Sequence, residues 1–272
     1  MSIFSNVLMA VDADGTLLTD EKEILDIDKN AIREFRENGG LFTIATGRAV
    51  SYTRPIVREL GLDVPAVTTN GAMVYDFQSE RVLWQSLLPQ SARGLLLGIK
   101  DRYPSMGIDI LRGEDLFSVS SNRHSEEHFR SICVTPIRCS LDEVPGDDWS
   151  KILLVDEPDV IADVAEYTAG LDGGGVYFVC SCPVFCEMLP QGTNKWGGIK
   201  KLLEVSGIDA RYVVTAGDYL NDLEMVKMAD LGVAVANALD MVRENADLVV
   251  CDNNNGAITE IVEWLMNKHA HW

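Results

Sequence analysis

Two hydrophobic patterns alternate along both ends of the chain. Continuous apolar runs such as Val7–Val11 are typical of strands that are buried on both faces. Between these runs lie segments such as Ile27–Asn38, whose apolar residues recur at helical spacing before Gly39 and Gly40 end the pattern. Strands and helices that alternate in this way predict an α/β fold, a doubly wound parallel sheet with helices on both faces.

The elements expected in these two parts follow from the same patterns. Asp26 or Asp28 is expected to cap the first helix. Strands are expected at Val7–Val11, Leu41–Ala45, Ala66–Thr69, Tyr212–Ala216, Leu231–Ala236 and Ala246–Val250. Helices are expected at Ile27–Asn38, after Arg48 as far as Leu60, and at Trp196–Glu204, Asn221–Ala229 and Ile258–Met266.

The middle of the chain has a different pattern, in which short strands form hairpin-like pairs. This pattern predicts an α+β cap domain of residues 84–188, inserted into a doubly wound domain that is formed by residues 1–83 and 189–272. The expected strands are Ile108–Leu111, Leu116–Ser120, Lys151–Val155, Val176–Cys180 and Phe185–Leu189, and the expected helices are Ser91–Tyr103 and Pro158–Leu171.

The balance of charge narrows the range of partners. Among 272 residues, 23 Lys and Arg stand against 42 Asp and Glu, which gives a net charge of −19. A surface this acidic repels nucleic acids and anionic membranes, so neither is expected as a partner. No apolar run approaches the roughly 18 residues of a membrane span, and the first residues do not resemble a signal peptide. We therefore expect a cytoplasmic protein, and no pattern indicates its oligomeric state.

The chain has six cysteines, three of which are evenly spaced at Cys180, Cys182 and Cys186. This spacing is interpreted as one face of an extended segment that carries buried free thiols. A zinc site is the alternative, but the segment lacks the usual CxxC pairs, and no histidine lies nearby in the sequence.

Polar side chains gather where the expected parallel strands end. Ligands of this fold bind beyond the carboxyl ends of the strands, so we expect these residues to converge on one rim. A turn or a helix cap explains single residues such as Asp20, but not acidic groups at several strand ends with a lysine between them. The set comprises Asp12, Asp14, Thr46, Gly47, Arg48, Asn70, Gly71, Lys195, Gly217, Asp218, Asn221 and Asp222.

The residue types on this rim suit phosphate chemistry. Asp12, directly after the first strand, can act as a nucleophile, and Asp14 can act as a general acid and then as a general base. Two carboxylates this close repel each other unless a hard cation lies among them, and Mg²⁺ prefers such oxygen ligands. Asp218 and Asp222 would complete its shell from the far strand. Three glycines, Gly15, Gly47 and Gly217, allow the backbone to approach a phosphate closely.

These motifs resemble those of the haloacid dehalogenase-like phosphohydrolases. The similarity is to the Cof-type branch, which carries a large α+β cap of type IIB after the third strand. The motifs keep the family's order and spacing over nearly the whole chain. They are Val11–Leu17, Ile44–Arg48, Lys195 and Gly217–Asp222, with similar pieces at Asn70–Ala72, Leu189–Gly192 and Gly232–Ala238.

The resemblance implies a role for each matching position. It implies that Asp12 forms an aspartyl-phosphate, that Asp14 is the acid and base, and that Arg48 is a candidate for steering the cap or the leaving group. The implied Mg²⁺ ligands are the Asp12 carboxylate, the Asp14 main-chain carbonyl, Asp218 and Asp222. The implied phosphate contacts are Ala13, Thr46, Gly47, Lys195 and Asn221.

The resemblance also implies a function, a Mg²⁺-dependent phosphatase that hydrolyses a small phosphorylated metabolite such as a sugar phosphate. Within the family, the alternatives are a specialised phosphatase or a mutase for phosphoglycolate, a sucrose or mannose derivative, or a nucleotide or cofactor phosphate. A phosphoacceptor signalling module also places Asp, Thr and Lys around Mg²⁺, but it lacks the second aspartate and the cap. An inactive binding protein is disfavoured, because no matching catalytic position is missing. The cap residues match no pattern that identifies a substrate.

Overall fold

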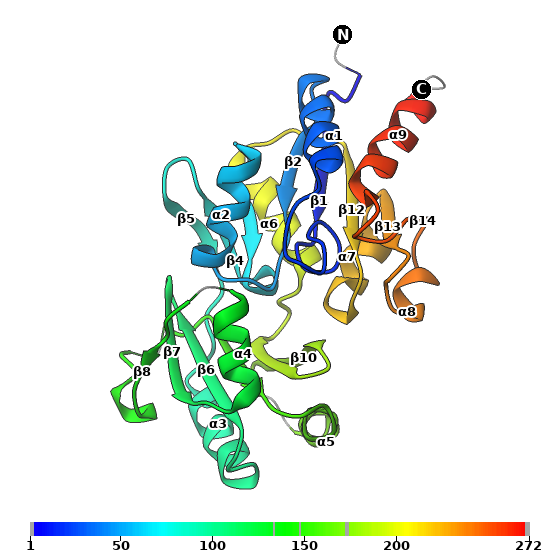
Figure 1. The fold of residues 1–272 in the computed structure, drawn as a ribbon. Coiled ribbons are helices and arrows are strands. Elements are labelled where there is room, and N and C mark those ends of the chain that lie inside the picture. Colours follow the sequence, from blue (N-terminus) through cyan, green and yellow to red (C-terminus); the bar gives the residue numbers. More distant parts are fainter. Residues whose placement is uncertain (1–2, 133, 147, 172–173, 270–272) are drawn as a thin grey trace. The chain divides into compact units, whose positions relative to one another are not determined.

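The computed structural model describes residues 3–132, 134–146, 148–171 and 174–269, and it divides the chain into two compact units (Figure 1). The core unit comprises Met1–Arg48, Thr53–Trp84 and Asn194–Trp272. The inserted unit comprises Ala49–Tyr52 and Gln85–Thr193. The core unit contains a parallel sheet and the inserted unit a separate sheet of its own, so the predicted fold class is confirmed.

The core unit is built on a five-stranded sheet with the strand order β14-β13-β12-β1-β2, in which all neighbouring strands are parallel. Because β1 lies between β12 and β2, the residues that follow β1 have a strand end on either side of them at the sheet's carboxyl edge. The strands are β1 (Val7–Val11), β2 (Leu41–Ile44), β12 (Tyr212–Gly217), β13 (Leu231–Val235) and β14 (Leu248–Val250).

Helices cover both faces of this sheet. Alternate residues of β1 belong to two different buried clusters, one shared with α1 and α9 and the other shared with α6 and α7. This explains why the strand is apolar throughout.

Among the described residues, no helix is long and apolar enough to cross a membrane. The helices of the core unit are α1 (Asp26–Glu37), α2 (Val50–Leu60, whose first residues as far as Tyr52 belong to the inserted unit), α6 (Lys195–Ser206), α7 (Leu223–Met228), α8 (Asp240–Arg243) and α9 (Ala257–His269).

The start of α1 differs from the prediction. The cap position is Leu25, and neither Asp26 nor Asp28 caps the helix. The Asp28 side chain is instead buried, and its Oδ1 accepts hydrogen bonds from the backbone N–H of Thr259 at 2.8 Å and from its hydroxyl at 2.7 Å. Asp28 therefore joins α1 to α9, a long-range role that its position in the sequence does not reveal.

The third expected strand lies in a different sheet. The strand β3 (Ala66–Thr68) belongs to a three-stranded sheet with β4 (Met73–Asp76) and β5 (Arg81–Gln85), and the bridge from Ala45 to Val67 connects it to β2. The chain reverses directly after β3, in the short helix η1 (Thr69–Gly71), where Asn70 has a φ of 53°. This early reversal makes β3 pair with β4 in antiparallel fashion.

The inserted unit has a six-stranded sheet in the order β10-β11-β9-β6-β7-β8. Its strands are antiparallel except for the pair β7 and β8. Its core lies between this sheet and the helices α3 and α5. The elements are α3 (Ser91–Arg102), β6 (Gly107–Arg112), β7 (Asp115–Ser120), α4 (Arg123–Ser131), β8 (Ile137–Arg138), η2 (Leu141–Glu143), β9 (Lys151–Val155), α5 (Pro158–Ala169), β10 (Val176–Cys182) and β11 (Phe185–Pro190).

The hydrophobic pattern does not predict α4, and the structure shows why. Ser125 and Phe129 are the buried residues of this helix, so it has almost no apolar stripe. The helix begins instead with a capping box, in which the Asn122 side chain accepts a hydrogen bond from the Ser125 backbone N–H at 3.1 Å.

The interpretation of the evenly spaced cysteines was wrong in one respect. Cys180 and Cys182 belong to β10, but Cys186 belongs to β11, which runs back alongside it. The chain reverses between Cys182 and Phe185, so the three residues do not form one extended face. All five cysteines in the described part of the chain are free, yet only Cys186 is fully buried. Cys133 lies outside the described residues.

Asp109 of β6 should make the stability of the protein depend on pH. Burial raises its pKa to about 7, although Ser118, Arg138 and Lys151 oppose the shift and Glu126 adds to it. Between the ordinary value of 3.8 and about pH 7, the folded chain binds the Asp109 proton more strongly than the unfolded chain does. Stability therefore falls as the pH rises through this window.

The pH prediction can be tested with the variant Asp109→Asn, which carries no ionisable group at this position. Urea unfolding of the wild type should show a free energy of unfolding that decreases from about pH 4 to about pH 7 relative to the variant, by about 1.4 kcal/mol per pH unit. The exposed Asp115→Asn on β7 is the matched control and should leave the profile unchanged. Parallel profiles for the wild type and Asp109→Asn would contradict the prediction.

Candidate active site

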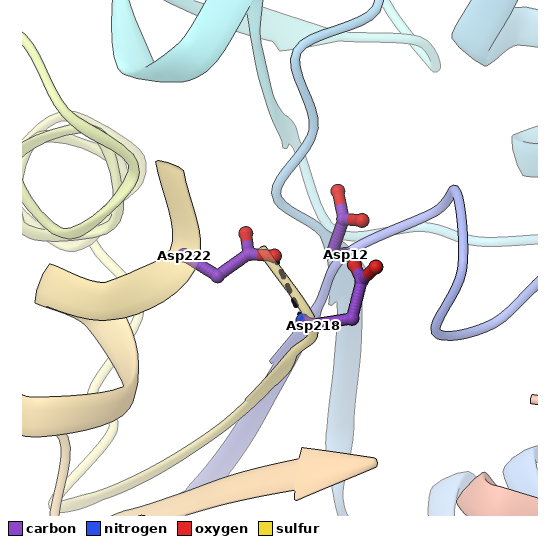
Figure 2. Close-up of side chains that lie close together, drawn as sticks. All are labelled: Asp12, Asp218 and Asp222. Atoms are coloured by element: carbon purple, nitrogen blue, oxygen red, sulfur yellow. Dashed lines mark hydrogen bonds between the residues drawn. The ribbon is translucent and has the colours of Figure 1, made fainter. Parts of the chain in front are cut away.

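Asp12 occupies the centre of the candidate site. It follows β1 directly, and its backbone N–H donates a hydrogen bond to the carbonyl of Ala216 in β12 at 2.9 Å. Its carboxylate lies close to those of Asp218 and Asp222, and carboxylate oxygens of the three lie within 4.8 Å of one another. Figure 2 shows Asp12 and Asp218 side by side at two neighbouring strand ends, with Asp222 beside them.

Lys195 is the cation of this cluster. Asn194 caps α6 by accepting a hydrogen bond from the Gly197 N–H at 2.7 Å, which places Lys195 in the first turn of the helix. Its side chain is fully buried, and Nζ donates to Oδ1 of Asp12 and to Oδ1 of Asp222, both at 2.5 Å. Burial alone would lower the pKa of Lys195, but the two facing carboxylates outweigh burial and raise it. Lys195 therefore stays charged.

Asp222 holds the other residues in place. Its side chain is fully buried. Oδ1 accepts from Lys195, and Oδ2 accepts from the backbone N–H groups of Asp218 at 3.0 Å and Tyr219 at 3.1 Å, the first of which is the dashed line in Figure 2. Asp222 therefore fixes both the lysine and the turn that carries Asp218.

Negative charge exceeds positive charge in the cluster of Asp12, Asp218 and Asp222. Burial raises the pKa of Asp12 to about 7, an effect that Lys195 opposes and the carboxylates of Asp222 and Asp14 enhance. Burial, followed by the charges of Asp222 and Asp12, raises the pKa of Asp218 to about 8. A single lysine thus does not neutralise the three carboxylates. The atoms that this cluster offers to a metal ion are all carboxylate oxygens. The cluster fits a hard divalent cation such as Mg²⁺.

Two glycines leave room for the carboxylates. Gly15 has a φ of +78°, and a Cβ atom there would lie 2.5 Å from Oδ2 of Asp218. A Cβ atom on Gly217 would lie 2.4 Å from the Cβ of Asp222. The sequence suggests that these glycines let the backbone approach a phosphate, and the structure adds that a side chain at either position would displace an aspartate.

Asp14 is held by two basic side chains. Arg48 donates from Nε to Oδ2 at 2.6 Å and from Nη2 to Oδ1 at 2.8 Å, and Lys22 donates to Oδ1 at 2.9 Å. Burial would raise the pKa of Asp14, but Arg48 and Lys22 together hold it well below its usual range. Arg48, to which the sequence assigns no firm role, thus orients Asp14. No motif marks Lys22, so sequence reasoning missed it.

The predicted phosphate contacts are linked through Asn70. The Asn70 backbone N–H donates to the carbonyl of Thr46 at 3.0 Å, and its side-chain Oδ1 accepts from Nδ2 of Asn221 at 3.0 Å. A Cβ atom on Gly47 would lie 3.0 Å from the same Oδ1. Asn70 therefore forms hydrogen bonds with two of the predicted contacts, Thr46 and Asn221, and lies close to the third, Gly47. Its place at a strand end was a signal, but its role as a linking residue was not predicted.

Ala13 is the predicted contact whose side chain cannot bind a phosphate. This side chain is fully buried in the core, and the Ala13 carbonyl accepts a hydrogen bond from the Leu18 N–H at 2.8 Å. Any contact of Ala13 with a phosphate has to come from its backbone N–H. Three sets of residues thus come together at one edge of the core sheet. They are Lys195 with Asp12 and Asp222, Asp14 with Arg48 and Lys22, and Asn70 with Thr46 and Asn221.

The comparison with known proteins decides the family. A model of the haloacid dehalogenase-like hydrolases matches residues 9–262 of this chain. The chain belongs to the haloacid dehalogenase-like hydrolases. The predicted membership is confirmed, and so is the predicted enzyme class, a phosphoric monoester hydrolase.

Relatives of this hydrolase are named phosphatases. It is 28% identical over 262 residues to the 5-amino-6-(5-phospho-D-ribitylamino)uracil phosphatase of Bacillus subtilis, covering 95% of this chain and 96% of that protein. It is 25% identical over 282 residues to the pyridoxal phosphate phosphatase of Escherichia coli, covering 94% and 97%. The solved structure of a subclass IIB sugar phosphatase has the same fold, with a TM-score of 0.83 at 20% identity over 95% of this chain and 98% of that one.

Proposed function

We propose that this hydrolase cleaves the phosphate ester of a small phosphorylated metabolite, such as a sugar phosphate, through an aspartyl-phosphate on Asp12. The position of Asp12 carries the proposal, because this residue follows β1 directly and its carboxylate contacts a buried lysine and lies beside Asp218. The relatives support the proposal, since two of them are named as phosphatases of a ribitylamino-uracil phosphate and of pyridoxal phosphate.

The first half of the proposed reaction transfers the phosphoryl group to Asp12. Lys195 holds Oδ1 of Asp12, so we assign the attack on phosphorus to Oδ2. The bond from phosphorus to the leaving oxygen breaks as Asp14 gives that oxygen a proton. The proposed contacts of the phosphoryl oxygens each offer a hydrogen-bond donor, and they are Lys195, Thr46, Gly47, Asn221 and the backbone at Ala13.

The second half restores the enzyme. Asp14 takes a proton from water, the water oxygen attacks phosphorus, and the bond between phosphorus and Oδ2 of Asp12 breaks to release inorganic phosphate. Arg48 and Lys22 hold Asp14 in the carboxylate form that this step needs. To donate a proton in the first half, Asp14 has to leave these two cations.

We propose Mg²⁺ as the cofactor, with Asp12, Asp218 and the Asp14 carbonyl as ligands and Asp222 in support. Bound there, the ion would offset the negative charge of the phosphoryl oxygens. The internal hydrogen bonds of Asp222 favour a supporting role, because Lys195 and two backbone N–H groups already occupy its oxygens.

We further propose that the inserted unit is the cap that selects the substrate. The core residues named above address the phosphate and the metal ion, which every candidate substrate shares, so they cannot distinguish one leaving group from another. The net charge of −19 supports our expectation that neither a nucleic acid nor a membrane is a partner, and a cytoplasmic location remains our expectation from the sequence.

A screen of phosphorylated metabolites for release of inorganic phosphate, with Mg²⁺ present, tests the proposed function. We expect turnover on one or more phosphomonoesters and none on phosphate-free analogues. Stoichiometric phosphorylation without turnover would instead indicate a phosphoacceptor module, and no reaction with any phosphomonoester would contradict the proposal.

Asp14→Asn should lower activity in a manner that depends on the leaving group. A general acid contributes about 10²–10⁴-fold, and most of this contribution is lost for an alkyl phosphate, whose leaving oxygen needs a proton. The loss should be smaller for p-nitrophenyl phosphate, which needs little protonation. Steady-state kinetics on both esters measure the ratio, and equal losses would count against Asp14 as the acid.

Removal of the metal should abolish activity. We expect no turnover in excess EDTA, full recovery with Mg²⁺ and poor recovery with Ca²⁺, which takes more ligands at longer distances. Asp218→Ala should raise the Mg²⁺ concentration needed for half-maximal activity, whereas Asp26→Ala on the exposed face of α1 should not. Undiminished turnover in EDTA would rule out the cofactor.

A further inference from the structure

The inserted unit contains a pair of thiols that the proposed reaction does not use. Cys180 of β10 and Cys186 of β11 are directly opposite each other in the antiparallel pairing of the two strands. Residues in such a pair have Cα atoms about 4.5 or 5.5 Å apart and side chains on the same face of the sheet. Both separations fall within the range of about 4.4–6.8 Å that disulfide bonds span.

The two thiols already contact each other. Neither is bridged, and they share a side-chain hydrogen bond. This hydrogen bond from Cys186 lowers the pKa of Cys180 to about 7, although burial and the charge of Glu187 oppose it, whereas the same contact and burial raise the pKa of Cys186. The pair is therefore asymmetric, because Cys180 is the better nucleophile and Cys186 keeps its proton.

A cavity gives access to this pair. It has a volume of about 420 Å³ and lies between α5 and the strand β10, and both Cys180 and Cys186 line it. Cys186 is only 1% exposed, whereas Cys180 is half-buried. A molecule as small as hydrogen peroxide fits this space many times over, so the cavity offers a route to a thiol that the strands otherwise cover.

Cys182 is a less suitable partner for either thiol. Its pairing partner across the hairpin is Phe185, and a register shift separates it from Cys180. Two residues of one strand lie about 6.6 Å apart at the usual rise per residue, near the upper limit for a disulfide. Burial also raises the pKa of Cys182 to about 12, so it is a poor nucleophile.

We propose that Cys180 and Cys186 form a reversible disulfide, with hydrogen peroxide or a similar small peroxide as the oxidant. The Cys180 thiolate attacks one peroxide oxygen, the O–O bond breaks, and a sulfenic acid and hydroxide form. The Cys186 sulfur then attacks the Cys180 sulfur, and the sulfenic oxygen leaves as water with the thiol proton. In total, two thiols lose two electrons and two protons, and one peroxide becomes two waters.

The experiment treats the fully reduced protein with hydrogen peroxide, alkylates the remaining thiols after denaturation, and maps the peptides by mass spectrometry. We expect the wild type to carry two fewer alkylated cysteines, with one cross-linked peptide that joins Cys180 to Cys186, and dithiothreitol to reverse both changes. A disulfide between other cysteines, or oxidation that leaves both residues alkylated, would overturn the proposal.

Single variants separate the roles of the two sulfurs. Cys186→Ser should leave a sulfenic acid on Cys180 that dimedone traps, whereas Cys180→Ser should form neither the bridge nor the trapped adduct. Cys182→Ser is the matched control on the same strand and should form the bridge as the wild type does. Cys180→Ala replaces Cys180→Ser if the serine variant does not fold, and loss of the bridge in Cys182→Ser would contradict the proposal.

Discussion

Asp12→Asn is expected to lower kcat by about 10⁴-fold or more, the scale on which loss of a catalytic nucleophile acts. An amide cannot attack phosphorus as a carboxylate does, and no other residue of the cluster stands at the same strand end. The fold should survive, because the amide keeps the shape of the side chain and can still accept a hydrogen bond from Lys195.

The effect of Asp12→Asn has to be separated from a general loss of structure. Far-ultraviolet circular dichroism and the unfolding midpoint should match those of the wild type, and the exposed Asp26→Asn on α1 should retain full activity. Near wild-type turnover in Asp12→Asn would exclude Asp12 as the nucleophile.

Lys195→Met is expected to destabilise the protein by about 3–5 kcal/mol, the cost of leaving buried charges without their partner. Lys195 is fully buried and contacts both Asp12 and Asp222, so methionine fills its volume but leaves two carboxylates facing each other. The loss should shrink at acid pH, where the Asp12 carboxyl group, whose pKa burial raises to about 7, is protonated. Urea unfolding, followed by circular dichroism at neutral and acid pH, measures both effects.

Lys201→Met provides the matched control for this prediction. Lys201 lies on the same helix α6 with a side chain that is 40% exposed and an ion pair to Glu204, so the change should stay within about 0.5 kcal/mol. A similarly small change in the free energy of unfolding for Lys195→Met would contradict the prediction, because it would show that the buried ion pairs contribute little to stability.

The sequence was sufficient to predict the elements that bury a regular apolar face. The strand Val7–Val11 and the helices Ser91–Tyr103 and Pro158–Leu171 were predicted to within two residues, because their patterns have the period of a covered strand or of an amphipathic helix. The helix Arg123–Ser131 was missed because a capping box and a single aromatic residue hold it in place instead.

The candidate site shows a similar division between local and long-range information. Asp12, Asp218 and Lys195 could be found because each stands at a strand end or a helix start, where this fold places its ligands. The contacts of Lys22 with Asp14 and of Asn70 with Asn221 could not be found, because they join loops that are distant in the sequence or carry no motif. Asp28 was misjudged for the same reason, since its partner Thr259 lies 231 residues away.

The most direct test of the account is to trap the phosphorylated enzyme. The protein is mixed with an excess of a phosphomonoester that it hydrolyses, quenched in acid during turnover, and reduced with borohydride, which converts an aspartyl-phosphate to homoserine. Peptide mass spectrometry should find homoserine at position 12, and none in Asp12→Asn or without substrate. Turnover with Asp12 unmodified, or a phosphoryl group on any other residue, would contradict the account.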